Sequence, residues 1–253
     1  MDLNLRDRVV IVTGGSRGLG RAICLALAEE GAKLTINYRS RSQPATQLAG
    51  EIKAAFDVEP LTVAGDVSDF ADVEQIFRRT AEVHGDVDIL INNAGIWLTA
   101  LVEDMTPQQW NDTLAINLTG SFLMCREAAR RWRAGGRKGR IVNIVSPAAF
   151  RASTIGHADY AASKAGLAAL TVSLAREMAP HGIHVNAVAP GFMETDMTRE
   201  ALDHSRQRYL SRIPLGRIAD AAEVANVVTL LASDRASYVT GATMDVTGGV
   251  LMR

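Results

Sequence analysis

Short runs of β-branched and aliphatic residues alternate along the chain with longer segments in which apolar residues recur every three or four positions. The short runs predict strands at residues 8–13, 33–38, 60–64, 88–92, 140–145, 183–188 and 243–246. The longer segments predict helices at 19–30, 43–56, 69–84, 110–132, 159–179 and 221–232. Because the strands are apolar almost throughout and helices separate them, the pattern is typical of a parallel sheet that is covered on both faces.

The alternation predicts an α/β fold class: a doubly wound, Rossmann-type parallel sheet of about seven strands, with helices on both faces as a three-layer sandwich. No linker rich in proline, glycine or serine divides residues 1–253, and no segment repeats, so we expect a single domain. Residues 193–212 depart from the pattern because they are polar and follow the sixth strand. A segment beyond the carboxyl end of a strand favours a substrate-covering loop or helix, and the alternative is an ordinary surface excursion.

The composition is that of a globular protein and excludes several classes of function. Of the 253 residues, 47% are hydrophobic and 22% are charged, and the net charge is −1, which gives no indication of nucleic-acid binding. No apolar run approaches the roughly 18 residues of a membrane span, and the N-terminus lacks the pattern of a signal peptide. Cys24 and Cys125 lie in apolar helical patterns and are interpreted as packed free thiols, so we expect a cytoplasmic protein.

A glycine-rich turn lies between the first strand and the first helix. Its sequence from residue 13 to residue 20 is Thr-Gly-Gly-Ser-Arg-Gly-Leu-Gly. Glycines in such a turn let the backbone approach a pyrophosphate, and the N-terminus of the following helix supplies N–H donors and a favourable dipole. In this strand–turn–helix context the motif predicts a dinucleotide site, with candidate residues Gly14, Ser16, Arg17, Gly18, Leu19 and Gly20.

The end of the second strand distinguishes between the two nicotinamide dinucleotides. NAD-binding sites place a carboxylate there to bind the ribose 2′-hydroxyl, but this chain has Tyr38, Arg39 and Ser40. Guanidinium groups bind a 2′-phosphate, so Arg17 together with Arg39 or Arg41 predicts NADP(H) as the cofactor. The alternative is that these arginines are solvated surface residues.

Two further groups of residues follow predicted strands. Asp66 and Val67 end the third strand, in a place suited to contact an adenine ring. Asn93, Ala94 and Gly95 follow the fourth strand. Either group alone could form a simple turn, but the carboxyl ends of parallel strands lie at one edge of a sheet. We therefore expect both groups to line the same cofactor site.

Candidate acid–base chemistry lies in a predicted helix further along the chain. Tyr160 and Lys164 are four residues apart and share one helical face. A fixed ammonium beside a phenol favours the phenolate, so Lys164 is expected to lower the pKa of Tyr160 toward working pH. Such a tyrosine can give a proton to a developing alkoxide or take one from an alcohol. Alone, the spacing indicates no more than a surface pair.

Four motifs stand in the order of one known family: the glycine-rich turn, Asn92-Asn93-Ala94-Gly95, the pair Tyr160 and Lys164, and Pro190-Gly191. Over essentially its whole length the chain resembles the short-chain dehydrogenases/reductases. Within that family it is most similar to the β-ketoacyl-[acyl-carrier-protein] reductases of fatty acid biosynthesis. This closer similarity lies in residues 185–198, 213–217 and 238–249.

The resemblance implies a catalytic tetrad and further cofactor contacts. Tyr160 would be the acid–base group, Lys164 would bind the nicotinamide ribose, and Ser146 would hydrogen-bond the substrate carbonyl. Asn117 would hold a water that feeds protons to the lysine. Pro190, Gly191 and Thr195 would complete the cofactor site, Thr195 by contacting the nicotinamide carboxamide. No residue is assigned to a metal.

The function that the resemblance implies is NADPH-dependent reduction of a 3-oxoacyl thioester to the 3-hydroxyacyl thioester, with Tyr160 as the proton donor. The alternatives are another carbonyl or secondary alcohol as the substrate (a polyol, a polyketide intermediate or a small ketone) and a nucleotide-binding regulator without turnover. The resemblance also implies a homotetramer built from the helices around Met124 and Leu170 and from the C-terminal segment. It links Arg137 and Arg176 to docking of an acidic acyl carrier protein, although the basic cluster around Arg137 could equally be a solvated helix end.

Two features depart from the family's pattern. Pro147 follows Ser146 directly and restricts its backbone, and the loop over 147–159 is about one residue longer than expected. The loop contains three residues to which no role is assigned: Phe150, Arg151 and His157. Trp97 either faces the substrate or packs in the interior. These departures concern the identity of the substrate and not the chemistry.

Overall fold

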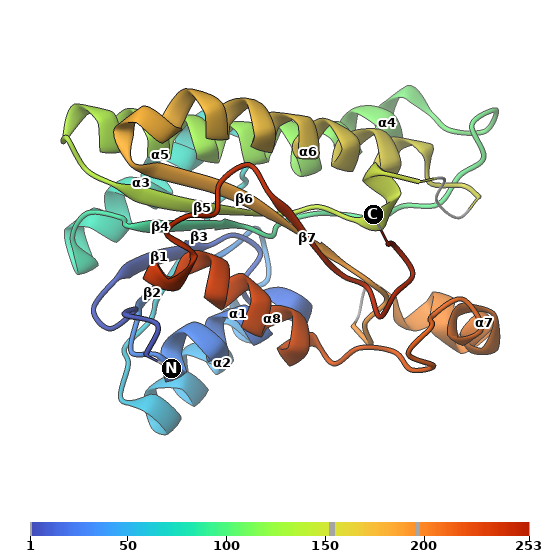
Figure 1. Cartoon of the computed structure of the whole chain (residues 1–253), viewed down its shortest axis with the longest axis horizontal. Coiled ribbons are helices and arrows are strands. Elements are labelled where there is room, and N and C mark those ends of the chain that lie inside the picture. Colours follow the sequence, from blue (N-terminus) through green and yellow to red (C-terminus); the bar gives the residue numbers. More distant parts are fainter. Residues whose placement is uncertain (1, 152–154, 196–197, 253) are drawn as a thin grey trace.

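The computed structural model describes residues 2–151, 155–195 and 198–252, and its strands form one parallel sheet (Figure 1). The strand order is β3-β2-β1-β4-β5-β6-β7. The bounds are β1 (Val9–Val12), β2 (Lys33–Tyr38), β3 (Leu61–Ala64), β4 (Ile89–Asn92), β5 (Gly139–Ile144), β6 (Ile183–Pro190) and β7 (Thr243–Val246). The order reverses between β1 and β4, so the predicted doubly wound sheet is confirmed.

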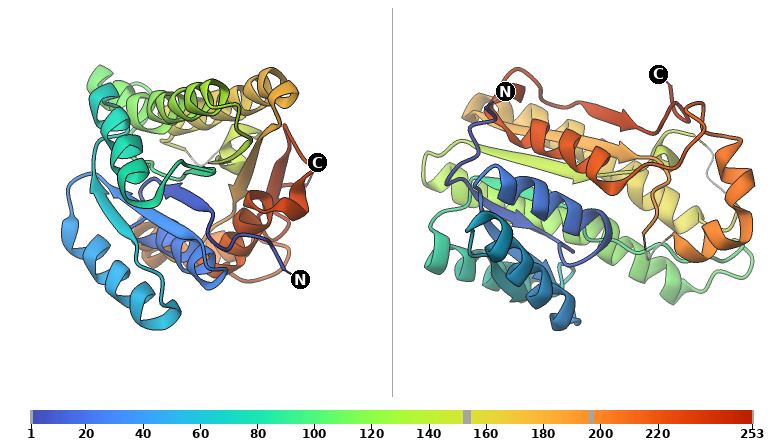
Figure 2. Two further views of the ribbon diagram at one scale, coloured as in Figure 1. Left: turned by 90° about the vertical axis from the view of Figure 1, so that its left-hand side faces the viewer. Right: turned by 90° about the horizontal axis from the view of Figure 1, so that it is seen from below.

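The helices form two layers, one on each face of the sheet (Figures 1 and 2). One layer contains α1 (Gly18–Glu29), α2 (Ser42–Phe56) and α8 (Ala221–Ala232). The opposite layer contains α3 (Phe70–His84), α5 (Ser121–Ala134) and α6 (Ala158–Met178). Short 3₁₀ turns lie at η2 (Pro147–Ala149), η3 (Ala179–His181) and η4 (Asp234–Ala236). The predicted three-layer arrangement is therefore also confirmed.

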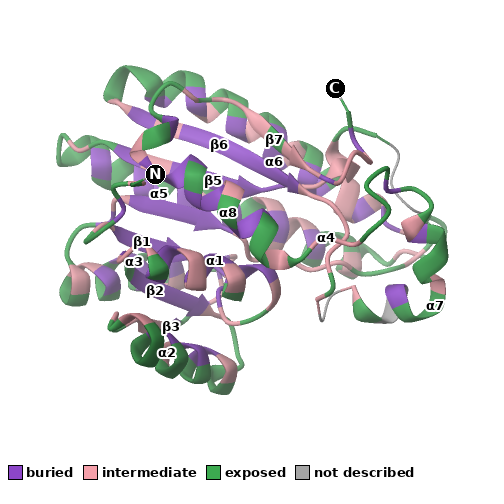
Figure 3. Cartoon of the chain, turned by 60° about the horizontal axis from the view of Figure 1, so that its bottom comes forward, coloured by how far each residue is buried: buried purple, intermediate pink, exposed green. Residues whose placement is uncertain are grey.

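Side-chain alternation along the central strand explains why both faces of the sheet are covered. In β1, Val10 and Val12 pack with the helices α1, α2 and α8, whereas Val9 and Ile11 pack with α3 and α5. Successive side chains of a strand point to opposite faces, so a strand that is apolar at every position needs cover on both sides. Figure 3 shows the result, with strands that are buried along their length and helices that expose their outer sides.

The segment predicted as one helix over 110–132 consists of consecutive elements instead. α4 (Pro107–Leu114) follows the N-cap Thr106 and passes into a π-helical turn, η1 (Ala115–Gly120), which leads into α5. A π-helical turn interrupts the regular ladder of helical hydrogen bonds, and such turns are frequent at functional sites. The apolar period of the sequence continues through all of these elements, which is why the pattern did not reveal the interruption.

The polar segment at residues 193–212 contains a helix, α7 (Arg199–Leu210). Helical geometry is interrupted within it at Ser205, where φ is −145° and ψ is 28°. A parallel bridge between Met193 and Ala219 joins the two ends of the excursion. α7 lies beyond the carboxyl ends of the strands (Figure 2). The segment therefore leaves the sheet and returns to it at the edge where the predicted functional residues gather.

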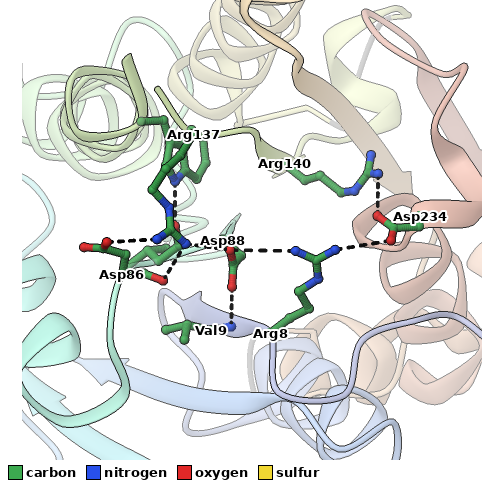
Figure 4. A network of polar contacts seen from close by, with 9 residues as sticks. Arg8, Val9, Asp86, Asp88, Arg137, Arg140 and Asp234 are labelled. Atoms are coloured by element: carbon green, nitrogen blue, oxygen red, sulfur yellow. Dashed lines mark hydrogen bonds and ion pairs between the residues drawn. The ribbon is translucent and has the colours of Figure 1, made fainter. Parts of the chain in front are cut away.

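Ion pairs join the amino ends of three strands at the opposite edge of the sheet (Figure 4). Arg8, before β1, lies 3.2 Å from Asp234 and 3.9 Å from Asp88. Asp234 also accepts a 2.9 Å hydrogen bond from Arg140 of β5, and this bond is the main cause that holds the pKa of Asp234 below its usual value. Asp88 precedes β4 and accepts the N–H of Val9 at 3.0 Å. The network therefore links β1, β4 and β5 at the end that faces away from the candidate chemistry.

Both cysteines are free thiols and are buried, as predicted. Burial raises the pKa of Cys125 to about 12, and burial also raises the pKa of Cys24. A thiol is a nucleophile only as the thiolate, so both groups act as packed interior residues at neutral pH. Across the ranges described, no helix has the length and apolar character needed to cross a membrane.

Candidate active site

Predicted functional residues follow or end four of the strands, and so lie where the carboxyl ends of the strands meet, called here the carboxyl edge of the sheet. Gly14 lies beyond β1, Asn93 lies directly after β4, and Ser146 follows β5 by two residues. Pro190 is the last residue of β6. Because parallel strands all end at the same edge, positions far apart in the sequence meet there.

The glycine-rich turn after β1 packs so closely that side chains do not fit at two of its positions. Gly14 has φ of +59°, and a Cβ there would lie 3.0 Å from the Cα of Ala94. A Cβ at Gly20 would lie 2.2 Å from the carbonyl oxygen of Gly14, well inside contact distance. Glycine is required at Gly20 because α1 can approach the turn so closely only without a side chain, and it is favoured at Gly14 by the positive φ and by the close approach of Ala94.

Two polar residues hold this turn against the segment that follows β4. The hydroxyl of Thr13 accepts the N–H groups of Asn93 and Ala94, each at 3.0 Å. The side-chain amide of Asn93 donates to the carbonyl oxygens of Thr13 and Gly14, each at 3.0 Å. Sequence reasoning did not assign a role to Thr13. Its hydroxyl at the end of an otherwise apolar strand was the available signal.

The N-terminus of α1 has the properties of an anion site. Arg17 occupies the N-cap position without a side-chain capping bond, and the first turn carries no acidic residue. Gly18 has φ of +53°, and a Cβ there would lie 3.5 Å from Cβ of Thr195, so the turn faces the segment after β6. Ser16 is half-buried and Leu19 is buried beneath the turn. The open N–H groups and the glycine cradle fit the pyrophosphate of a dinucleotide.

The residues after β2 and β3 lie side by side, as the parallel pairing of these strands requires. Arg39 follows the last residue of β2, Tyr38, and its guanidinium lies 3.9 Å from a carboxylate oxygen of Asp66. The other carboxylate oxygen of Asp66 accepts the N–H and the hydroxyl of Ser68, at 2.9 and 2.6 Å. Arg39 and Ser40 are exposed. A cation therefore stands at this edge, with a neighbouring carboxylate that Ser68 holds in place.

Val67 connects the cofactor residues after β3 with the π-helical turn. It is buried, and a Cβ on Gly120 would lie 2.6 Å from its Cγ2 atom. Gly120 is the last residue of η1. The predicted adenine end of the site and the element that carries Asn117 are therefore in direct contact.

Ser146, after β5, and Tyr160, on α6, lie close enough for hydrogen bonding between their hydroxyl groups to influence the pKa of the phenol. Burial raises the pKa of the Tyr160 phenol, and the hydrogen bond with Ser146 opposes that increase. Lys164 was expected to lower the pKa of Tyr160, but in the folded chain the pKa of this phenol is raised. Tyr160 is half-buried, and partial removal of its phenol from water disfavours the phenolate more strongly than the neighbouring groups favour it.

Lys164 lies beside Tyr160 without binding its oxygen. Its Nζ atom is 5.8 Å from the centroid of the Tyr160 ring and donates a 2.7 Å hydrogen bond to the carbonyl oxygen of Ile144. Burial lowers the pKa of Lys164 from 10.5 to about 8. The ammonium is therefore the dominant form at neutral pH, and its position is fixed by the end of β5.

Asn117 lies in the π-helical turn and is fully buried. Its side chain accepts the N–H of Ile96 at 2.8 Å and donates to the carbonyl of Ile96 at 3.0 Å and to the hydroxyl of Ser163 at 3.1 Å. A Cβ on Gly95 would lie 3.2 Å from Oδ1 of Asn117 and 3.7 Å from Nζ of Lys164. Gly95 thus lies between the amide and the ammonium, and a side chain there would crowd the amide of Asn117.

The segment after β6 is held against β7, the outermost strand of the sheet. The N–H of Gly191 donates a 2.8 Å hydrogen bond to the carbonyl of Val246, and a Cβ on Gly191 would lie 2.8 Å from the Cα of Thr247. The N–H of Thr195 donates to the hydroxyl of Thr198 at 3.1 Å. Pro190, Gly191 and Thr195 therefore lie at the carboxyl ends of the strands, together with the glycine-rich turn.

Pro147 does not disturb Ser146. Ser146 has φ of −161° and ψ of 155°, the extended conformation that a following proline favours, and Pro147 begins the 3₁₀ turn η2. The side chain of Ser146 also accepts the N–H of Ala148 at 3.2 Å. The proline therefore stabilises the turn that follows the serine.

The unassigned residues before Tyr160 pack against the segment after β4. The rings of Trp97 and His157 are stacked, with centroids 4.4 Å apart and an angle of 22° between their planes. Nδ1 of His157 lies 2.8 Å from the carbonyl of Leu98, and because a carbonyl only accepts, Nδ1 carries the proton. Arg151 donates to the carbonyl of Val250, near the C-terminus. Part of the loop, residues 152–154, lies outside the described residues.

Arg137 and Arg176 lie at the other end of the molecule. The guanidinium of Arg137 is paired with Asp86 and Asp88, each at 2.9 Å (Figure 4). Arg176 is exposed in the last turn of α6, whose 21 residues span about 30 Å from the end that carries Tyr160. The fold therefore does not bring either arginine to the site of its own chain. Within the described ranges, no group of three or more His, Cys, Asp or Glu side chains is placed to hold a metal ion.

Comparisons with known sequences show the family of the chain. The family model described as Enoyl-(Acyl carrier protein) reductase matches residues 14–251. The chain is 41% identical over 242 residues to the 3-oxoacyl-[acyl-carrier-protein] reductase FabG of Staphylococcus aureus (strain Mu50), which covers 96% of this chain and 97% of the relative. It is also 41% identical over 252 residues to the protein of the same name from Escherichia coli (strain K12), covering 99% of this chain and 100% of the relative.

Solved structures give the same family. A short-chain type dehydrogenase/reductase from Mycobacterium marinum matches with a TM-score of 0.95 at 30% identity, covering 100% of this chain and 98% of that one. A dehydrogenase/reductase from Sinorhizobium meliloti 1021 matches with a TM-score of 0.93 at 36% identity, covering 99% and 98%.

The doubly wound sheet, the glycine cradle and the Ser146–Tyr160–Lys164 cluster together define a dinucleotide-dependent oxidoreductase. The chain belongs to the short-chain dehydrogenase/reductase family, as the order of its motifs predicted. It is accordingly an enzyme that acts on CH–OH and C=O groups with NADP(H) as its cofactor.

Proposed function

We propose that this enzyme reduces the ketone of a 3-oxoacyl thioester to the 3-hydroxyacyl thioester with NADPH. The observation that carries the proposal is that Ser146, at the end of β5, lies close enough to Tyr160 for hydrogen bonding between the two hydroxyl groups to influence the pKa of the phenol. Two donors aimed at one carbonyl oxygen stabilise the oxyanion that develops during reduction, and such stabilisation is commonly the largest catalytic contribution. The two relatives at 41% identity are named for this activity.

Tyr160 is the proton donor. Burial raises the pKa of its phenol, so the group is protonated at neutral pH and can transfer its proton to the alkoxide oxygen. Ser146 hydrogen-bonds the carbonyl oxygen and stabilises the phenolate that remains on Tyr160 after the transfer. When bound, NADPH supplies the hydride that adds to the carbonyl carbon.

Lys164 and Asn117 support this proton transfer. An ammonium has three donors, and Lys164 uses one of them on Ile144, which leaves donors for the hydroxyls of the nicotinamide ribose. The side-chain amide of Asn117 is occupied by Ile96 and Ser163. A water that feeds protons to Lys164 would therefore have to bind Asn117 through its backbone carbonyl, which accepts the hydroxyl of Ser121 at 3.1 Å.

The cofactor would extend along the carboxyl edge of the sheet. The pyrophosphate would lie on the turn formed by Gly14, Ser16, Gly18, Leu19 and Gly20. The 2′-phosphate would meet Arg39, with Ser40 and Arg17 nearby, and the adenine would lie toward Tyr38, Asp66 and Val67. The nicotinamide would lie among Asn93, Ala94, Gly95, Pro190, Gly191 and Thr195. This assignment rests on the cation at the end of β2 and on the open N-terminus of α1.

An apolar acyl chain suits the surroundings of Tyr160 better than a polyol does. Two loops flank the start of α6, and their described residues include exposed apolar side chains, namely Leu98, Leu101, Val102, Phe150 and Ile155. The stacked rings of Trp97 and His157 join the two loops. The hydroxyls of a polyol would lose hydrogen bonds to water at such a surface, whereas an acyl chain gains by leaving water.

The segment at residues 193–212 would cover the substrate, and residues 1–253 would form a single domain. The support is that α7 lies beyond the carboxyl ends of the strands and that the segment returns to the sheet at the bridge between Met193 and Ala219. Residues 196–197, within this segment, lie outside the described residues.

A carrier-linked substrate and a homotetramer are further parts of this proposal, as is a cytoplasmic location. A surface hollow beside Arg137 is lined by Arg133, Lys138 and His181 among others, which would suit an acidic acyl carrier protein. Because Arg137 and Arg176 lie at the amino ends of the strands, a carrier docked there would serve the active site of another subunit. The tetramer would use the helices around Met124 and Leu170 and the C-terminal segment.

A substrate panel with NADPH oxidation as the readout tests the function. The panel contains 3-oxoacyl thioesters of increasing chain length, the same 3-oxoacyl groups on an acyl carrier protein, an enoyl thioester, small ketones and the oxidised forms of polyols. We expect the highest kcat/KM on 3-oxoacyl thioesters and none on the enoyl thioester. Equal or higher rates on small ketones or sugars would favour a different short-chain enzyme, and tight NADPH binding without turnover on any carbonyl would favour a regulator.

A further inference from the structure

A buried carboxylate stands directly before Tyr160 and has no part in the chemistry described so far. Asp159 lies in the first turn of α6 and is 0% exposed. Moving a charge out of water is costly unless hydrogen bonds compensate for the loss. Because Asp159 is shielded from water, other groups must stabilise its carboxylate beside the proton donor.

Three neutral donors hold this carboxylate. One oxygen accepts the N–H of Tyr160 at 2.7 Å. The other oxygen accepts the hydroxyl of Thr113 at 2.8 Å and the side-chain amide of Gln109 at 3.3 Å. The N-terminal end of α6 adds a favourable dipole for a negative charge. Thr113 is itself fully buried, so this part of the contact is shielded from solvent.

The donors belong to two elements that carry candidate catalytic residues. Gln109 and Thr113 lie in α4, which passes directly into the π-helical turn that contains Asn117. Tyr160 lies in the first turns of α6. The carboxylate of Asp159 is therefore a direct polar link between the helix that presents the phenol and the helix that leads to Asn117.

We propose that Asp159 is a positioning residue for Tyr160: it binds the backbone of Tyr160 and the side chains of α4 at once, and so holds the phenol against Ser146. This inference rests on the proposed function, because it takes Tyr160 as the proton donor. The competing explanation is that Asp159 only stabilises the start of α6. The two explanations differ in what a substitution does to turnover in protein that remains folded.

Substitutions of Asp159 by alanine and by asparagine distinguish these explanations. An asparagine keeps one oxygen to accept the N–H of Tyr160, and its NH₂ group can donate to the Thr113 hydroxyl, so the link survives without the charge. An alanine removes the link. The matched control is Asp112→Asn, the same change at an exposed aspartate of α4 that binds Gln108 of the same helix at 2.8 Å.

The first measurement is steady-state reduction of acetoacetyl-CoA by NADPH on the folded variants. We expect Asp159→Ala to lower kcat by about 10- to 100-fold with little change in the KM for NADPH, because a displacement near 1 Å at a reacting group has effects of this size. Asp159→Asn should stay within a few-fold of wild type, and Thr113→Val should lie between them. Normal kcat in Asp159→Ala, or a loss that merely follows the folded fraction, would overturn the proposal.

The second measurement needs no turnover. The phenol of Tyr160 is titrated by ultraviolet difference absorbance, with Tyr160→Phe counterparts to isolate its signal. Both Asp159 variants lack the charge, so the difference between them reports geometry alone. We expect a higher Tyr160 pKa in Asp159→Ala than in Asp159→Asn, because loss of the Ser146 hydrogen bond leaves burial unopposed. Equal values in the two variants would contradict the inference, whereas an inactive wild-type enzyme would contradict only the proposed function.

Discussion

The ammonium of Lys164 donates a 2.7 Å hydrogen bond to the backbone carbonyl of Ile144, the last residue of β5. The bond ties α6 to the strand end that leads, two residues later, to Ser146. It also leaves Nζ of Lys164 5.8 Å from the centroid of the Tyr160 ring, and so beside the phenol. One contact between a buried helix residue and a strand end therefore sets the spacing of the three polar groups on which reduction depends.

Lys164 should make stability depend on pH in a defined window. Burial lowers its pKa from 10.5 to about 8, so between these values the unfolded chain holds more protons than the folded one, and the free energy of unfolding rises with pH. We expect the unfolding free energy of wild type, minus that of Lys164→Met, to rise by up to about 3 kcal/mol across this window. Denaturant titrations at several pH values measure the difference.

Subtracting the unfolding free energy of Lys164→Met from that of wild type removes the contributions of the other titrating groups. Cys24, Cys125 and Tyr160 have pKa values raised by burial and act in the opposite direction at alkaline pH, but all three are present in both proteins. A difference that stays flat from pH 8 to pH 10.5 would show that Lys164 is not desolvated as described.

Tyr160→Phe should abolish turnover and leave NADPH binding nearly unchanged, because it removes only the proton that the phenol gives. Ser146→Ala should lower kcat by about 100- to 1000-fold, the usual effect of deleting one oxyanion donor. It should also move the alkaline limb of the pH–rate profile to higher pH, since the Ser146 hydrogen bond opposes the raised pKa of Tyr160. Stopped-flow binding and pH–rate profiles measure these effects, and normal rates in Tyr160→Phe would reject the assigned acid.

Arg39 should determine the preference for NADPH over NADH. It is the cation at the end of β2, 3.9 Å from Asp66, and a hydrogen bond to a charged group contributes roughly 1.5–3 kcal/mol. We expect Arg39→Ala to raise the KM for NADPH by about 10- to 100-fold and to leave the KM for NADH nearly unchanged. Arg79→Ala, which breaks an exposed ion pair with Glu82 on α3, is the matched control. Equal weakening of both cofactors would place the 2′-phosphate elsewhere.

Gly20 should tolerate no side chain. A Cβ there would lie 2.2 Å from the carbonyl oxygen of Gly14 and 2.6 Å from Nδ2 of the Asn93 side chain. Gly20→Ala must therefore displace α1 from the turn. We expect loss of dinucleotide binding and a lower melting temperature. Gly50→Ala, in α2 with nothing within 4 Å, is the control and should stabilise the protein by about 1 kcal/mol. Calorimetry with and without NADPH distinguishes the two outcomes.

The order of the strands could be predicted from the sequence, and candidate site residues could be proposed at their carboxyl ends, because both depend on local patterns. β-branched runs and apolar helical periods indicate each layer, and the strand–turn–helix context indicates the glycine cradle. The four ordered motifs gave the family. These sequence patterns are short-range, because a buried strand, an amphipathic helix and a glycine-rich turn each extend over no more than about 20 residues.

The tertiary structure alone decided how those residues act on one another. It placed a π-helical turn at Asn117 where the apolar period predicted an unbroken helix, and it showed that burial raises the pKa of Tyr160 instead of Lys164 lowering it. It also joined Asp159 to α4. The link from Asp159 to Thr113 joins residues 46 apart, and Asn117 is held by Ser163, also 46 residues away. The raised pKa of Tyr160 depends on the loss of water around the phenol, and desolvation is a property of the packed interior that no local pattern encodes.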